Sequence, residues 1–238
     1  MQKIRKSADR GTTKQDWLDS KHTFSFGDYY DPAHIRFGVL RVINEDKVHP
    51  TTGFGTHPHR DMEILTYVLE GALEHKDTLG TSSIIQSGDV QRMSAGTGIA
   101  HSEYNPLHDR QVHLLQIWIT PEKKGLVPSY EQKNFSKKRK PGELTLIASP
   151  DGFKGSLTIH QDVSLSVLDL APGQSFRYNM EEDRMVWAQI VHGQVSLDET
   201  SLKQGDGLEV RQERALEFRA PEKAEILIFN LPGDGLLE

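Results

Sequence analysis

The chain of 238 residues contains no cysteine. This absence excludes disulfide bonds and thiolate ligands for a metal ion, and it leaves the redox compartment open, so the cytoplasm is the expected location. The sequence also lacks an apolar run long enough to span a bilayer. Residues 1–6 are basic, but no apolar segment of a secretory signal follows them. We therefore expect no membrane partner.

An excess of positive charge is also lacking. The 28 Lys and Arg residues are outnumbered by 34 Asp and Glu, which gives a net charge of −6 at pH 7. Nucleic-acid binders use a basic surface to neutralise phosphates, so a nucleic-acid partner is not expected. A basic run at residues 137–140 precedes Pro141-Gly142 and is interpreted as a solvated linker, with a DNA-binding patch as the alternative.

The pattern of apolar residues is that of an all-β protein. Short segments rich in Val, Ile, Leu, Thr and aromatic residues alternate with Gly, Pro, Asn and Asp turn signals. The expected strands are residues 64–69, 83–86, 111–120, 144–148, 164–170, 186–191 and 224–230. The polar, Pro-bounded stretch near 122–142 is expected to connect two halves, with some local helix at 129–134. We expect domains at 1–121 and 144–238, joined by a linker at 122–143.

The two halves resemble a degenerate repeat. A strand ending at Gly71 is followed by Gly88-Asp89, and a strand ending at Gly193 is followed by Gly205-Asp206. A generic β-hairpin likeness is the alternative. Aromatic residues of the segment 172–178 stand in the second half where the first half has histidines. The second half is therefore expected to bind no metal and to pack against or complete the first.

Two pairs of metal-ligand residue types stand out: His57 and His59, then His101 and Glu103. Alternate residues of a strand share a face, so each pair would point to one side, and two facing strands would present four ligands to one point. Three imidazole nitrogens and a carboxylate oxygen suit a divalent first-row metal and leave positions open for substrate. The alternative is that a His-x-His pair serves only in hydrogen bonds of a half-buried strand.

The wider sequence resembles a known family. The Gly-rich His-x-His-x-x-x-Glu element, the Gly after a strand, the Gly-Asp pair and the last His give the two-motif layout of the cupin superfamily. Segments 17–26, 37–46, 56–63 and 94–103 are further similar to the pirin family, in its bacterial quercetinase-like members. The likeness runs from about residue 10 to about residue 235. It implies two tandem cupin barrels, a bicupin of double-stranded β-helix (jelly-roll) type. Many members have an extra glycine where this chain has Thr51-Thr52.

The resemblance implies a site. One divalent metal would be bound by His57, His59, His101 and Glu103, and iron(II) is the expected ion, with nickel, cobalt, manganese, copper and zinc also compatible. In many cupins the equivalent of Glu63 is a ligand. Here we expect Glu63 to orient a ligand histidine instead, although strand parity alone leaves both roles open. The other eight histidines are expected to bind no metal.

The resemblance also implies an activity. Such proteins are similar to quercetin 2,3-dioxygenases, which open a flavonol ring with dioxygen and release carbon monoxide. Glu103 would be the catalytic base that takes the proton of the flavonol hydroxyl. Two alternatives stay open: a metal-dependent regulatory, redox-sensing binding protein, as pirin is described, and a cupin enzyme with another substrate. No oligomeric state follows from the sequence.

Overall fold

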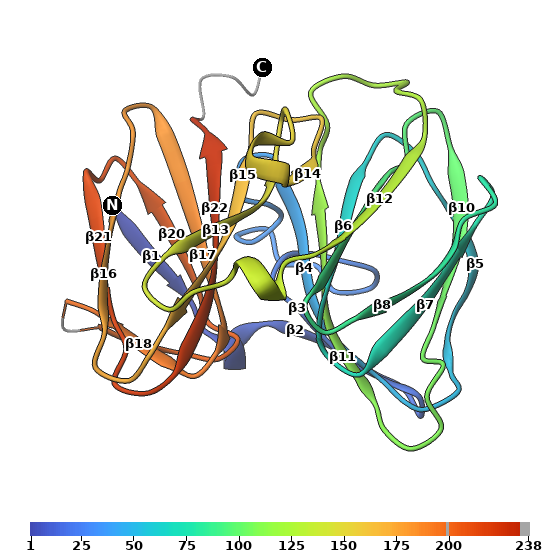
Figure 1. Ribbon diagram of the computed structural model, residues 1–238, viewed down its shortest axis with the longest axis horizontal. Coiled ribbons are helices and arrows are strands. Elements are labelled where there is room, and N and C mark those ends of the chain that lie inside the picture. Colours follow the sequence, from blue (N-terminus) through green and yellow to red (C-terminus); the bar gives the residue numbers. More distant parts are fainter. Residues whose placement is uncertain (199, 234–238) are drawn as a thin grey trace.

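Two β-barrels lie side by side in the computed structural model, which describes residues 1–198 and 200–233 (Figure 1). The barrel drawn mainly in green and cyan comes from the first half of the chain, and the orange and red barrel comes from the second half. All seven strands expected from the sequence are present. Among the described residues, no helix has the length and apolar character needed to cross a membrane.

Within the described part of the chain, eleven strands form each barrel. The first barrel contains β2 (Gly11–Lys14), β3 (Leu18–His22), β4 (Leu40–Val48), β5 (Gly53–His59), β6 (Glu63–Glu70), β7 (Ala72–Asp77), β8 (Ser82–Gln86), β9 (Asp89–Ser94), β10 (Ile99–Tyr104), β11 (Val112–Ile119) and β12 (Ser129–Asn134). The second contains β1 (Gln2–Arg5), β13 (Leu144–Ser149), β14 (Leu157–Thr158), β15 (Ser164–Leu170), β16 (Ser175–Asn179), β17 (Arg184–His192), β18 (Gln194–Leu197), β19 (Thr200–Lys203), β20 (Gly207–Arg211), β21 (Ala215–Arg219) and β22 (Ala224–Pro232). Residues 1–198 and 200–233 also contain three short 3-10 helices: η1 (Ser7–Asp9), η2 (Ser136–Lys138) and η3 (Phe153–Gly155).

The strand order repeats between the barrels. The seven-stranded sheets run β12-β9-β6-β11-β4-β3-β2 and β1-β20-β17-β22-β15-β13-β14, and the four-stranded sheets run β5-β10-β7-β8 and β16-β21-β18-β19. Strand β16 of the second barrel therefore occupies the place of β5, which carries His57 and His59. The repeat expected from the sequence is thus a repeat of topology.

The structure departs from the predicted halves at the N-terminal strand and at the connecting segment. Strand β1 pairs with β20 in the second barrel, while β12 pairs with β9 in the first. The local helix expected at 129–134 is wrong, because those residues are β12, paired antiparallel with β9 from Ser129 opposite Ser94 to Asn134 opposite Asp89. Backbone pairing along a sheet edge outweighs the weak local propensity of this polar segment. The domain boundaries at 121 and 144 stay a prediction.

Apolar side chains fill the space between the two seven-stranded sheets and the interior of the second barrel. Leu65 and Ile117 of the first barrel belong to one buried cluster with Val167, Trp187 and Phe229 of the second. A separate apolar cluster occupies the second barrel's interior. Burial of this apolar area is the main force that holds the barrels together.

The first barrel has a polar layer in its interior. A row of side chains in register crosses five strands: His22, Asn44, Gln116, Thr66 and Gln91. All five are buried. Two apolar clusters lie in the same barrel, one with Leu73 and the other with Met93. Buried polar groups usually have hydrogen-bond partners, and in this layer His22 pairs with Asn44 and Thr66 with Gln116. This layer is therefore where the barrel can hold polar chemistry.

Candidate metal centre

The two predicted ligand pairs lie on neighbouring strands of one sheet. Strands β5 and β10 are antiparallel, and His57 stands directly opposite His101. Our expectation of two strands that face each other is therefore wrong in its geometry, because β5 and β10 are neighbours in one sheet. Residues directly opposite in an antiparallel pair project to the same face with close Cβ atoms, so adjacent strands bring the imidazoles together.

A β-bulge in β5 shifts the pairing register between β5 and β10. His101 pairs with His57 but Glu103 pairs with Phe54, so β5 has one residue more than β10 in this stretch. Within the bulge, Nδ1 of His57 lies 2.8 Å from the carbonyl oxygen of Gly55. A carbonyl oxygen can only accept, so Nδ1 carries the proton and Nε2 keeps its lone pair.

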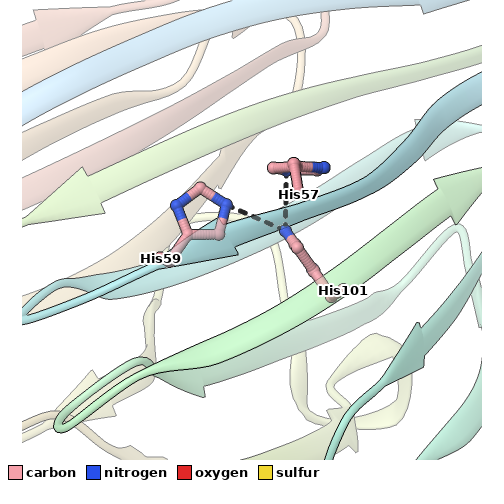
Figure 2. A group of neighbouring side chains, drawn as sticks. All are labelled: His57, His59 and His101. Atoms are coloured by element: carbon pink, nitrogen blue, oxygen red, sulfur yellow. Dashed lines mark hydrogen bonds between the residues drawn. The ribbon is translucent and has the colours of Figure 1, made fainter.

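Three imidazole nitrogens converge on one point (Figure 2). Nε2 of His101 lies 3.0 Å from Nε2 of His57 and 3.0 Å from Nε2 of His59. Two nitrogens bound at right angles to an ion at about 2.1 Å would stand about 3.0 Å apart. The spacing of these donors therefore fits a divalent metal ion.

Lowered pKa values keep two of the three donors, His59 and His101, neutral. Burial, and then the nearby His57, lower the pKa of His59 to about 4. Burial, and then His57, His59 and His75, lower the pKa of His101 to about 2. A neutral imidazole is the form that binds a metal, so the site holds lone pairs near neutral pH.

Glu103 lies beside this cluster and is buried. One of its carboxylate oxygens lies within 4.8 Å of ring nitrogens of His75 and His101. The amide Nε2 of Gln116 donates to the carboxylate at 2.9 and 3.1 Å, and the Thr66 hydroxyl donates to the Gln116 amide oxygen at 3.1 Å. Burial raises the pKa of Glu103 to about 7. The hydrogen-bonded chain fixes where the carboxylate points.

A pocket of about 370 Å³ opens onto His57, His59 and Glu103. Aromatic rings line it in pairs. Trp118 packs edge-on against His59 at 5.0 Å and against Phe26 at 5.3 Å, and a second aromatic pair, Trp17 and Phe54, also packs at 5.0 Å. Ligand pockets commonly combine apolar walls with a few placed polar groups, and this pocket has that composition.

Glu63 lies elsewhere. Its Oε2 accepts from the Ser94 hydroxyl at 3.0 Å and from the backbone N–H of His160 at 3.2 Å, and it contacts no ligand histidine. The expectation that Glu63 orients a ligand is therefore wrong. A turn at Asp61, which has φ of 49°, separates β5 from β6, so strand parity does not carry across. Glu63 has the parity of Leu65, which faces the second barrel.

Sequence reasoning missed two residues of the centre, Gln116 and His75. His75 is fully buried and its Nδ1 lies 3.3 Å from Nδ1 of His101. The alternation of Leu73, His75 and Asp77 along β7 was a usable signal, because Leu73 is a core residue. Gln116 carried a comparable signal, as a polar residue in the apolar strand β11.

Two cupin-type barrels with a histidine centre in the first define the class of this protein. Residues 3–119 match the family described as Pirin, and residues 146–231 match the Quercetinase C-terminal cupin domain. The chain belongs to the pirin family.

Similar proteins agree with that placement. The chain is 46% identical to a protein of Escherichia coli K12 named quercetin 2,3-dioxygenase, over 96% of this chain and 98% of that one. It is 42% identical to a putative quercetin 2,3-dioxygenase of Pseudomonas aeruginosa, over 92% and 94%. The solved structure of the bacterial pirin YhhW from Escherichia coli in complex with nickel(II) has a TM-score of 0.93 at 45% identity, covering 98% of this chain and 100% of that one.

Proposed function

We propose that this protein is a metal-dependent dioxygenase of the quercetin 2,3-dioxygenase type, which opens a flavonol with dioxygen and releases carbon monoxide. The names of the similar proteins support this activity. The observation that carries it is the aromatic-lined pocket of about 370 Å³ that ends at His57, His59 and Glu103. A planar polyphenol and a metal-ligand cluster can meet there.

His57, His59, His101 and Glu103 would hold one divalent ion, for which we propose iron(II). Nickel, cobalt, manganese, copper and zinc also suit imidazole and carboxylate donors. A bound ion would supply positive charge that favours the ionised form of the flavonol hydroxyl and would orient the substrate toward dioxygen.

Glu103 is proposed to accept the flavonol proton. The O–H bond of the substrate hydroxyl breaks, its electron pair stays on that oxygen, and the proton moves to the Glu103 carboxylate. Gln116 and Thr66 hold that carboxylate at the pocket through the hydrogen bonds described above. Burial of Glu103, which is 3% exposed, keeps bulk water from exchanging freely with the proton.

The aromatic walls are proposed to position the substrate ring. Trp118 and Phe26 form one wall, and Trp17 and Phe54 form another pair. Aromatic side chains bury large apolar area and prefer edge-on or offset contacts with a ring. Such contacts would leave the hydroxyl-bearing edge free to face the histidines.

We infer that the first barrel, which takes in most of the predicted domain 1–121 together with β12 of the predicted linker 122–143, is catalytic. The second barrel, most of the predicted domain 144–238 together with β1, would support it, in a cytoplasmic protein. An oxygen electrode and a carbon monoxide assay test the activity: iron-loaded protein should consume dioxygen and release carbon monoxide with quercetin. His101→Ala should lose this activity, whereas His192→Ala, in the second half, should keep it. No uptake with any divalent metal would instead favour the regulatory role.

A further inference from the structure

Behind His101, on the side away from His57 and His59, lies a buried histidine–aspartate pair from β7. Nδ1 of His75 lies 3.3 Å from Nδ1 of His101, and Nε2 of His75 lies 3.0 Å from Oδ2 of Asp77. The side chains of His75 and Asp77 are both 0% exposed. The three groups thus form a continuous chain away from the metal centre.

The other carboxylate oxygen of Asp77 accepts hydrogen bonds from the turn between β7 and β8. Its Oδ1 accepts from the backbone N–H groups of Leu79 at 2.9 Å and Thr81 at 3.0 Å. These hydrogen bonds and the bond to His75 lower the pKa of Asp77, even though burial acts in the opposite direction. Asp77 is therefore a carboxylate with a fixed orientation.

The hydrogen-bond partners along this chain determine which ring nitrogens of His75 and His101 carry a proton. The Asp77 carboxylate can only accept, so Nε2 of His75 carries a proton and its Nδ1 has a lone pair. That lone pair accepts from Nδ1–H of His101. Nε2 of His101 is then left unprotonated, facing His57 and His59.

We propose that Asp77 and His75 are positioning residues that hold His101 in the tautomer and ring orientation needed to bind the divalent ion. The proposal rests on the metal site of the proposed function, and it does not depend on which substrate is used. Partners that hold the far nitrogen of a metal-binding imidazole fix its tautomer and raise its basicity. Here a second imidazole stands between the ligand and the carboxylate.

A second ion bound by His75, His101 and Glu103 is the competing arrangement, because these residues also offer donors within 4.8 Å of one another. It would require His101 to lose both ring protons and bridge two ions. A shared proton between two nitrogens 3.3 Å apart needs no such change.

Asp77→Asn is the diagnostic substitution. The backbone N–H groups of Leu79 and Thr81 can only donate, so the amide oxygen must stay on them and the NH₂ group must face His75. His75 would then accept at Nε2, carry its proton on Nδ1 and donate to His101. That reversal moves the His101 proton to Nε2, where it competes with the metal.

Asp31→Asn is a matched control. Oδ1 of Asp31 accepts from a backbone N–H, that of Ala33, at 3.0 Å, and its Oδ2 lies 2.7 Å from Nδ1 of His34. This pair, like Asp77 with His75, joins a histidine to an aspartate that also accepts from a backbone N–H, although it is partly exposed, and it contacts none of the three converging imidazoles. The control therefore separates loss of an aspartate–histidine pair from loss of this particular one.

The experiment measures nickel(II) affinity by chelator competition for the wild-type, Asp77→Asn and Asp31→Asn proteins, with thermal melting as the check on folding. Asp77→Asn should lose about 10- to 100-fold in affinity, and Asp31→Asn should stay within about twofold of wild type. Equal affinity of the wild-type and Asp77→Asn proteins would overturn the proposal.

Nitrogen-15 NMR of the imidazoles in zinc-loaded and metal-free wild-type protein gives a readout that needs no variant. The proposal requires a proton on Nδ1 of His101 and on Nε2 of His75. A proton on Nε2 of His101 in the metal-free protein, or two zinc ions per chain with one lost in His75→Gln, would overturn it. Failure of wild-type protein to bind any metal, with the proton positions as stated, would reject the metal centre and not the tautomer assignment.

Discussion

A Cβ atom on Gly53 would lie 2.1 Å from the backbone carbonyl oxygen of Glu103. The strand that carries His57 and His59 therefore touches the strand that carries His101 and Glu103 at a point where only a glycine fits. Gly53→Ala should push β5 away from β10 and cost at least about 10-fold in metal affinity, because the donors lose their spacing. Chelator competition measures this loss.

Gly55→Ala is the matched control, since a Cβ there would meet nothing within 4 Å. Its carbonyl oxygen can still accept from His57. We expect its metal affinity to be close to that of wild type. Equal losses in both variants would show that the close approach at Gly53 does not control the site.

Thr51 occupies a left-handed conformation, with φ of 58°. A β-branched residue is strained there by about 1–3 kcal/mol. Glycine would remove the strain but loses about 0.5–1 kcal/mol through its greater freedom when unfolded. Thr51→Gly should therefore raise the free energy of unfolding by about 1 kcal/mol, as measured by urea denaturation. A destabilised Thr51→Gly, or an equal gain in Thr52→Gly, would contradict this account.

Burial raises the pKa of Asp46 to about 6, although the Ser20 hydroxyl donates to its carboxylate and opposes the shift. The unfolded value is about 4. The folded state therefore binds a proton more tightly, and stability present below about pH 4 is lost as pH rises through about 6.

In metal-free protein, this loss should amount to about 2 kcal/mol for wild type relative to Asp46→Asn between pH 4 and 7. Urea denaturation at several pH values measures the difference, in which groups common to both proteins cancel. Parallel pH profiles for the two proteins would exclude the shift.

Flavonoids that differ only at the 3-hydroxyl test the coordination role. Quercetin should support oxygen uptake, whereas luteolin, which lacks that hydroxyl, should react more slowly by about 10³-fold or more, because Glu103 has no proton to accept and the ion has no oxygen to bind. An oxygen electrode compares them under identical conditions. Similar rates would mean that ring stacking alone selects the substrate.

The sequence predicted the buried strands well because each one shows its pattern of apolar residues within its own short segment. Residues 64–69 and 164–170 alternate or run apolar over their whole length, and both fall within strands. Strand β1 had no such signal. It has four residues, and its partner β20 lies about two hundred residues away, so only the folded topology joins them.

The site, too, could be predicted from the sequence only in part. His57, His59, His101 and Glu103 were candidates from spacing alone, because alternate residues of a strand share a face. Which strands are neighbours depends on the topology of the sheet, which spacing does not specify, so the expectation of two facing strands was wrong. The role expected for Glu63 also failed, since the turn at Asp61 resets the direction of side chains.

A nickel(II) titration of wild-type protein beside His57→Ala and His101→Ala tests the central claim most directly. The convergence of the three Nε2 atoms predicts one ion per chain in wild type and loss of most binding in each variant, because each removes one of the few ligands. Full occupancy in either variant, or two ions per wild-type chain, would contradict the metal centre described for the first barrel.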